Sequence, residues 1–186
     1  MQNKIVYLWM LIFTTWLLAA CNNKTKDRAA NSSGSIVAAT KTAPGKNIAE
    51  NIIIDSSYHI FAMALDSTGL IETLKKPGPF TVFGPVDEAF NKLPEGVFES
   101  LMGRRRNDLI NILSYHIVAG SLKANELKDG DKLKTLAGEE LTVTVRNDKL
   151  TVNGTNVIGT DIESSNGIIH MIDGILFPRN QNPAVY

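Results

Sequence analysis

The stretches TVFGPVDEAF (residues 81–90) and GIIHMIDGILFP (residues 167–178) decide the fold of this chain. The first is typical of a short apolar strand over residues 81–83, followed by a corner at Gly84-Pro85 and the first turn of a helix from Asp87. A carboxylate in that turn faces the positive end of the helix dipole. The second stretch is an apolar run that predicts a strand. The sequence therefore predicts a strand-to-helix corner and a later strand within one folded unit.

Helical periodicity surrounds the first stretch. Apolar residues recur at helical spacing over residues 48–65, and Gly69 is placed to end that pattern. Further helices are predicted over residues 70–74, 87–92, 97–102 and 107–115. Helices are thus expected to fill the first half of the domain.

The pattern changes to a period of two after His116. Apolar side chains alternate with polar ones at Leu141, Val143, Val145, Leu150 and Val152. Asn147-Asp148 between them is typical of a two-residue hairpin turn. More strands are predicted at residues 157–158 and 168–177. Helices in the first half and strands in the second indicate an α+β class with mostly antiparallel pairing.

Together with Tyr115-His116, which lies between them, the two stretches resemble the signature segments of the fasciclin-type (FAS1) domain, a secreted adhesion and binding module. The resemblance runs from about residue 47 to residue 178. It implies a wedge of two small, mostly antiparallel sheets with helices packed on one side. The family motif falls on residues for which we expect a structural role: Thr81, Tyr115, His116, His170, Asp173 and Gly174.

The corner departs from the family pattern. The family usually has Ala before the proline and Thr or Ser after it, whereas this chain has Gly84 and Val86. Because Val86 has no hydroxyl, we expect the helix cap to pass to Asp87. The segment either only folds the domain or contacts a ligand. In the second case the candidate binding corner is Phe83, Gly84, Pro85, Val86 and Phe90, with Ile117 nearby, and it favours an apolar ligand over a sugar.

The histidines allow two interpretations. His116, at a predicted helix-to-strand junction, is either a hydrogen-bonded core residue, which we favour, or a ligand or catalytic residue. His170 should lie on the opposite strand face from Ile169 and Met171. A metal site would require His116, His170 and Asp173 to converge, and nothing in their spacing demands it. We therefore predict no metal and no cofactor.

Charge argues against a nucleic-acid-binding protein. The chain has 19 basic and 19 acidic residues, so no net field attracts a polyanion. The one basic cluster, at residues 104–106, has no interleaved aromatic residues and is typical of a solvated loop before a helix, with Asn107 and Asp108 as the expected cap.

The first 20 residues have the features of an export signal: a basic start at Lys4, an apolar run and small residues before Cys21. The Leu-Ala-Ala-Cys ending resembles a bacterial lipoprotein signal, in which the cysteine becomes the acylated N-terminus. Cys21 is the only cysteine, so it has no disulfide partner. Residues 21–46 are polar and predict a flexible tether. The domain is expected over residues 47–180, with a tail at residues 181–186.

Familiar catalytic motifs are absent from the sequence, so we predict a protein that is not an enzyme. We expect a module exported and lipid-anchored to a bacterial membrane, in the periplasm or on the cell surface, that binds an envelope protein or polysaccharide. The alternative is a carrier of an apolar small molecule such as a carotenoid, held near the corner. The sequence leaves the partner and the oligomeric state open.

Overall fold

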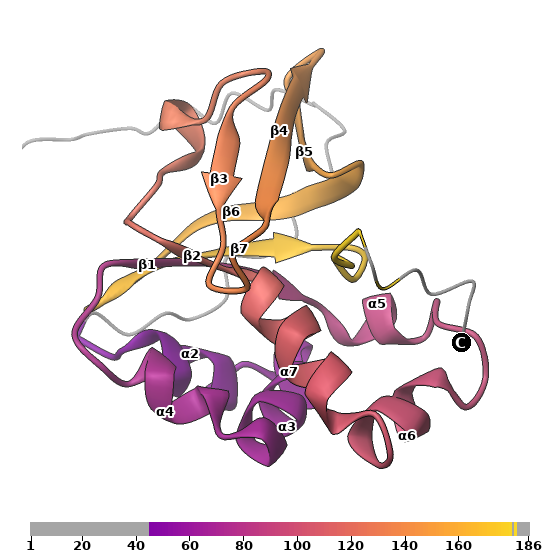
Figure 1. The fold of residues 1–186 in the computed structure, drawn as a ribbon. Helices are drawn as coiled ribbons and strands as arrows, with labels where there is room; N and C mark the ends of the chain where they lie inside the picture. Colours follow the sequence, from indigo (N-terminus) through magenta and orange to yellow (C-terminus); the bar gives the residue numbers. More distant parts are fainter. Residues whose placement is uncertain (1–44, 180, 182–186) are drawn as a thin grey trace, which may run out of the picture. The chain divides into compact units, whose positions relative to one another are not determined.

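The computed structural model of the chain describes residues 45–179 and 181 (Figure 1). In this part of the chain the helices are α2 (Ile48–Ile54), α3 (His59–Thr68), α4 (Leu70–Leu74), α5 (Asp87–Phe90), α6 (Val97–Met102) and α7 (Arg106–Tyr115), with 3-10 turns η1 (Ser56–Tyr58) and η2 (Ala124–Glu126). The strands are β1 (Phe80–Pro85), β2 (Ile117–Ala119), β3 (Lys132–Lys134), β4 (Glu140–Arg146), β5 (Lys149–Val152), β6 (Thr155–Ser164) and β7 (Gly167–Ile172).

The two signature stretches pair directly with each other. Strand β1 runs parallel to β7, from Phe80 opposite Gly167 to Pro85 opposite Ile172. Every other pair of neighbouring strands is antiparallel. The predicted α+β class with mostly antiparallel pairing is therefore confirmed.

The strands follow one another in a single order, β2-β1-β7-β6-β5-β4-β3, rather than in two separate sheets. Register shifts between Val157 and Gly159 and between Gly159 and Ile162 let β6 bend from β7 towards β5. At the ends of the order, the Leu136 N–H donates to the Ile117 carbonyl at 2.8 Å. The sheet therefore curls until its outer strands almost meet.

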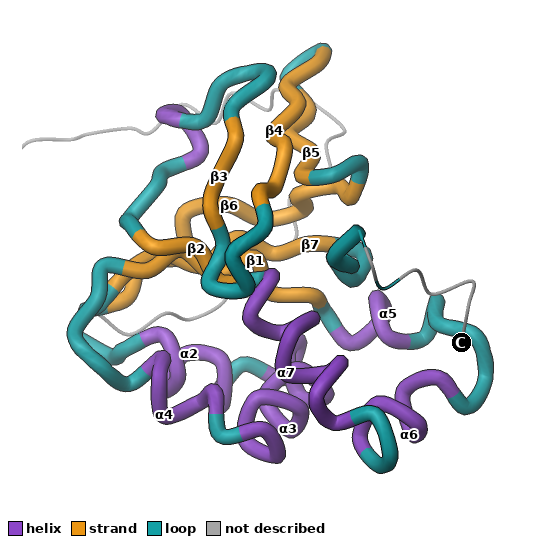
Figure 2. Tube along the Cα trace, viewed as in Figure 1, coloured by secondary structure: helices purple, strands orange, loops and turns teal. Residues whose placement is uncertain are grey.

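Two apolar cores lie on opposite faces of β1 and β7. Figure 2 shows α2, α3, α4 and α7 on one side of this strand pair and β3, β4 and β5 on the other. Val82 and Ile169 pack into the helical core, whereas Phe83 and Ile172 pack into the core inside the curled sheet. Burial of both faces is typical of parallel strands, and it leaves the signature strands in the middle of the domain.

Local predictions differ from the structure mainly at element ends. The predicted hairpin is confirmed: Asn147 and Asp148 have φ of 49° and 59° and connect β4 to β5. Strand β7 ends at Ile172 rather than at residue 177, because Asp173 leaves the ladder to accept bonds from Asn156.

Two predicted helices also have different bounds. Helix α5 ends at Phe90 rather than at residue 92. Helix α7 begins at Arg106 with Arg105 as its N-cap, so the expected cap by Asn107 and Asp108 is wrong; Asp108 instead accepts from Arg105 Nε at 2.7 Å.

Among the described residues, no helix combines the length and the apolar character that a membrane span requires. The predicted signal over residues 1–20, Cys21, the tether up to residue 44 and residues 182–186 of the tail lie outside the described residues. Asn47 caps α2 by accepting from the Glu50 N–H at 2.9 Å, and the first helix of the described part begins there.

Candidate binding groove

The corner that the sequence singled out is buried. Phe83 and Ile117 have no exposed surface, and Val86 and Phe90 are 5% and 8% exposed. The Val86 N–H donates to the Ile172 carbonyl at 3.1 Å, which ties the corner to the end of β7. The candidate binding corner, Phe83-Gly84-Pro85-Val86 with Phe90 and Ile117, therefore offers little surface to a ligand, because it lies between the helical layer and the curled sheet.

Gly84 is required by packing inside the protein. A Cβ at this position would lie 2.9 Å from Cε1 of Tyr58, a contact that real side chains do not make. Tyr58 is itself buried, and this burial raises the pKa of its phenol. The close approach that a glycine permits is thus used by the Tyr58 ring rather than by a ligand.

Asp87 caps a different helix from the one it begins. Helix α5 starts after Val86 and has no side-chain cap. The Asp87 carboxylate instead accepts from the Ile60 N–H at 2.8 Å, in the first turn of α3. The expectation that Asp87 caps its own helix is wrong, because its carboxylate points to the free N–H groups of a neighbouring helix.

His116 is buried with both ring nitrogens bonded. Nδ1 lies 2.7 Å from the Ile112 carbonyl, and Nε2 accepts from the Leu176 N–H at 3.0 Å. These partners require the neutral tautomer that carries its proton on Nδ1. Desolvation lowers the pKa of His116 to about 4. The ring therefore joins the end of α7 to the segment after β7 and has no nitrogen available for a ligand.

Thr81 and His170 hold the segment that follows β2. The Thr81 hydroxyl donates to the Gly120 carbonyl at 2.7 Å and accepts from the Leu122 N–H at 2.9 Å. His170 Nε2 donates to the Leu122 carbonyl at 2.9 Å, and its Nδ1 accepts from the Asp161 N–H at 3.3 Å. Burial lowers the pKa of His170, so the ring is neutral. These two motif residues fix the backbone of residues 120–122.

The other motif residues connect strands. The Tyr115 hydroxyl donates to the Glu140 carbonyl at 3.0 Å and accepts from Asn153 Nδ2 at 2.7 Å. Asp173 accepts from the Asn156 backbone and side-chain amides at 3.1 and 3.0 Å, which with nearby Lys92 lowers the pKa of this carboxyl. A Cβ at Gly174 would lie 3.1 Å from Thr155 Cγ2.

The sequence also raised a metal site and the basic cluster at residues 104–106. No group of three or more His, Cys, Asp and Glu side chains in the described range could hold a metal ion. In the basic cluster, Arg106 donates to the Ser67 carbonyl and Arg105 pairs with Asp108. The cluster therefore joins α3 to α7.

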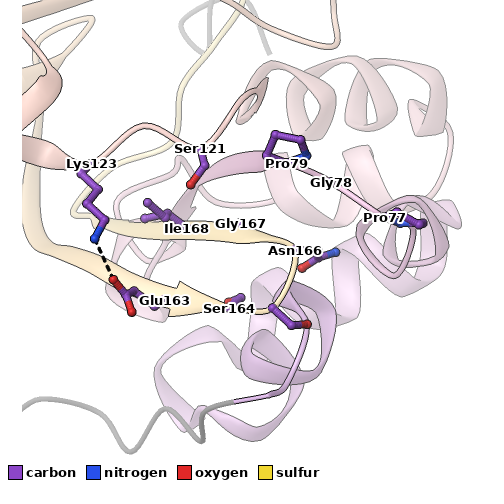
Figure 3. A pocket seen from close by; sticks show the side chains of 11 residues that line it. Pro77, Gly78, Pro79, Ser121, Lys123, Glu163, Ser164, Asn166, Gly167 and Ile168 are labelled. Atoms are coloured by element: carbon purple, nitrogen blue, oxygen red, sulfur yellow. Dashed lines mark hydrogen bonds and ion pairs between the residues drawn. The ribbon is translucent and has the colours of Figure 1, made fainter.

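An open groove of about 480 Å³ lies at the end of the sheet where β6 turns into β7. Figure 3 shows it from close by, with Lys123 and Glu163 at one end and Pro77 and Asn166 at the other. Three loop or turn segments and the first residues of β7 line it: Pro77, Gly78, Pro79, Ser121, Lys123, Glu163, Ser164, Ser165, Asn166, Gly167 and Ile168. One wall is the segment after β2 that Thr81 and His170 hold in place.

Asn166 fixes the opposite wall. Its Oδ1 accepts from the Ile48 N–H at 2.9 Å, and its Nδ2 donates to the carbonyls of Leu74 and Lys76 at 2.7 and 2.8 Å. The side chain thus ties the β6–β7 turn to α2 and to the end of α4. Sequence patterns do not predict this groove, because its lining residues come from segments far apart in the chain. Only the dipeptide Asn166-Gly167, which is typical of a turn, is a local signal at this place.

A single ion pair lies at the end of the groove. Lys123 Nζ is 2.9 Å from Glu163 Oε1, and the two side chains are 51% and 69% exposed. The bond to Glu163 raises the pKa of Lys123. Such exposed pairs contribute little to stability, so a ligand could replace either partner at small cost.

Next to the buried corner there is a much smaller space. It measures about 10 Å³ and is lined by Pro85, Phe90, His116 and apolar side chains of α6 and α7. Ligand pockets usually have volumes of roughly 300–1,000 Å³. The groove reaches that range, and the space beside the corner does not.

Comparisons with known proteins agree with this geometry. The model of the Fasciclin domain family matches residues 56–178. The chain is 38% identical over 144 residues to Protein sll1483 of Synechocystis sp., which covers 77% of this chain and 79% of that protein. It is 35% identical over 142 residues to the transforming growth factor-beta-induced protein ig-h3 of Sus scrofa, covering 76% of this chain and 21% of that protein.

A solved structure shares the fold. It is a FAS1 domain pair from the insect cell adhesion molecule Fasciclin I, with a TM-score of 0.65 and 20% sequence identity over 74% of this chain and 52% of that chain. The chain thus spans about half of the insect domain pair and about a fifth of ig-h3.

Proposed function

The chain belongs to the fasciclin domain family, and from this premise we propose that it is a non-enzymatic interaction module. In this proposal, acylated Cys21 anchors it to a bacterial membrane, and the domain binds a protein or polysaccharide of the cell envelope. The observation that carries the proposal is the open groove, whose walls are held by internal hydrogen bonds and which contains polar side chains but no free acid–base pair.

The hydrogen bonding and the charges of the titratable groups support a role in binding without catalysis. His116 and His170 are neutral, buried and bonded through both ring nitrogens, so neither can exchange a proton with a bound molecule. Within the described lining, the groove has one carboxylate, Glu163, and Lys123 neutralises it. A general acid or base needs a free group close to the substrate.

The position of Lys46, at the start of the domain, supports display of the groove on a tether. The Ser165 N–H, at the edge of the groove, donates to the Lys46 carbonyl at 2.8 Å. The tether therefore joins the domain beside the groove. In this proposal residues 21–46 form a flexible tether; a flexible segment of about 26 residues has a root-mean-square span on the order of 28 Å, which would keep the groove close to the surface that carries the anchor.

Membrane attachment is tested first. The full chain and its Cys21→Ser variant are expressed in a bacterial host with a clickable fatty acid, and membranes are separated from soluble protein. We expect label and membrane partition for the natural chain and neither for Cys21→Ser. Equal partition of the two proteins would contradict the lipid anchor.

Partner binding is tested with native envelope material. Immobilised full-length protein should retain an envelope protein or polysaccharide that survives washing, and heat-unfolded protein should not. If folded and unfolded protein retain the same material, the interaction proposal is wrong.

The carrier alternative remains a proposal with less support. A carotenoid would require an apolar pocket, and the space beside the corner is about 10 Å³. Freshly purified protein with a visible absorption band that follows it through gel filtration would favour the carrier over the interaction module.

A further inference from the structure

We propose that the groove binds a segment of an uncharged oligosaccharide. This inference rests on the proposed function and specifies its partner: a neutral glycan rather than a peptide or a charged polymer.

The polar lining can both donate and accept hydrogen bonds and has no net charge. Ser121 and Ser165 bring hydroxyl groups, which each donate and accept; the Ser164 hydroxyl accepts from Asn51 Nδ2 at 2.8 Å and still has a proton to donate. Lys123 and Glu163 cancel one another's charge across 2.9 Å. Sugar hydroxyls also donate and accept, so they complement such a surface, and the paired charges give the groove no net attraction for an ion.

Two exposed prolines add apolar surface to the lining. Pro77 and Pro79 present C–H surfaces among the polar groups. A sugar ring has C–H faces edged by hydroxyls, and a surface with mixed apolar and hydroxyl groups matches both parts of it. Half-polar lining of this kind suits a glycan better than it suits a lipid or a carotenoid.

The floor of the groove is closely packed backbone. A Cβ at Gly78 would lie 2.0 Å from the Asn166 carbonyl oxygen, and a Cβ at Gly167 would lie 1.9 Å from that of Phe80. Neither position tolerates a side chain, so these two backbone pairs keep their spacing. A preformed surface avoids the cost of ordering on binding, which matters for a ligand that binds mainly through weak hydrogen bonds.

The usual features of peptide recognition are missing from the described lining. Strand addition requires an open sheet edge, but β7 pairs with β1 on one side and with β6 on the other. Polyproline grooves are aromatic, and acidic-motif sites contain arginine clusters; the described lining has neither an aromatic residue nor an arginine. Helix-binding grooves are apolar, and this one is half polar.

The test uses full-length protein in detergent, titrated with N-acetylchitotetraose, cellotetraose and maltotetraose by isothermal calorimetry and amide chemical-shift mapping. We expect at least one tetrasaccharide to bind with shifts at residues 121–123 and 163–168. The affinity should change less than about twofold up to about 0.5 M salt, because an uncharged ligand is insensitive to screening. Absence of binding by all three, or shifts confined to other surfaces, would overturn the proposal.

A matched pair of variants locates the binding. Ser121→Tyr places a large side chain in the groove from an exposed position, and Ser56→Tyr makes the same change at an exposed position of η1 in the helical layer. Ser121→Tyr should weaken tetrasaccharide binding at least tenfold, and Ser56→Tyr less than twofold. Equal effects would contradict the groove as the site, and thermal melts of both variants check folding.

The same variants separate this proposal from the proposed function. In the envelope retention assay, loss of the partner by Ser121→Tyr alone supports the groove. Retention by both variants would leave the interaction module standing and overturn the groove. Strong loss of tetrasaccharide affinity with added salt would also overturn the neutral glycan, because it would indicate an ionic ligand.

Discussion

The corner at Gly84-Pro85-Val86 and the groove between Pro77 and Lys123 differ in nearly every physical respect. The corner is apolar, buried and packed against Tyr58. The groove is half polar, open and about 480 Å³ in volume. The corner carries the most recognisable sequence in the chain, and the groove is built from unremarkable loop residues. The recognisable sequence in this domain therefore belongs to the buried core, and the accessible groove is made by other residues.

The two regions are nevertheless connected. Thr81 precedes the corner on β1, and its hydroxyl holds the backbone of Gly120 and Leu122 in the groove wall. His170, on the adjacent strand, holds the Leu122 carbonyl from the same core. The signature strands thus shape the groove through buried polar contacts.

The largest expected effect is at the corner. Val86→Asp places a carboxylate at a position that is 5% exposed and lies in the apolar core of the helical layer. We expect a loss of about 3–5 kcal/mol in the free energy of unfolding, as for other uncompensated buried charges. Urea unfolding measures it. The matched groove variant Ser121→Asp should change stability by less than about 0.5 kcal/mol. Equal, small losses would show that the corner is as open as the groove.

Acid should destabilise the buried core next. The pKa of His116 is about 4 in the folded protein against 6.5 ordinarily, so between these values the unfolded chain binds more protons. Stability from this group is complete above about pH 6.5, falls as the pH decreases, and is reduced by about 3 kcal/mol near pH 4. His170 acts in the same direction, since burial lowers its pKa too.

Urea unfolding at a series of pH values measures this slope. His116→Gln should lower stability at neutral pH by about 1–3 kcal/mol, because the Leu176 and Ile112 backbone groups lose the partners they have now. It should also flatten the slope between pH 4 and pH 6.5. A slope that is unchanged in the variant would mean that His116 is not the buried titrating group.

Thr81→Val tests the connection between the two regions. The variant keeps the shape of the side chain but removes the hydroxyl that bonds the Gly120 carbonyl and the Leu122 N–H. We expect a loss of about 1–3 kcal/mol, faster amide exchange at Leu122 and weaker glycan binding. Amide exchange at Val86, which bonds to Ile172, serves as the control for the corner. Faster exchange at both amides would indicate general loosening instead.

The smallest effect is expected at the ion pair of the groove. Glu163→Gln removes one charge from a pair whose members are 51% and 69% exposed. Stability should change by less than about 0.5 kcal/mol. A loss comparable to that of Thr81→Val would show that the groove end is part of the fold rather than an adaptable surface. Thermal melts of the variant and the natural chain are sufficient to decide this.

Hydrophobic periodicity and turn residues predicted the elements that form between neighbours in the sequence. The hairpin of β4 and β5 follows from alternating apolar residues and the Asn147-Asp148 turn, and both are found. The opposite faces of Ile169 and His170 follow from the period of a strand. By contrast, the parallel pairing of β1 with β7 joins residues about 87 positions apart, and periodicity contains no information on such pairing.

The candidate site was harder to predict for the same reason. Asp87 is a residue type that commonly caps the helix it begins. Its hydrogen-bond partner, the Ile60 N–H, belongs to another helix. Gly84 permits a close approach to the backbone, and only the fold shows that the approaching group is Tyr58 of the protein itself. The groove brings together residues 77–79, 121–123 and 163–168, and tertiary folding alone makes them neighbours.

Thiol accessibility distinguishes a buried signature corner from an open groove. Cys21 is the only natural cysteine, so Val86→Cys and Ser121→Cys can each be placed singly in a full chain that carries Cys21→Ser. Labelling with a soluble maleimide under native conditions should modify Ser121→Cys at the rate of a free thiol. Val86→Cys should react at least about 100-fold more slowly, through local opening. Comparable rates at the two positions would contradict the account.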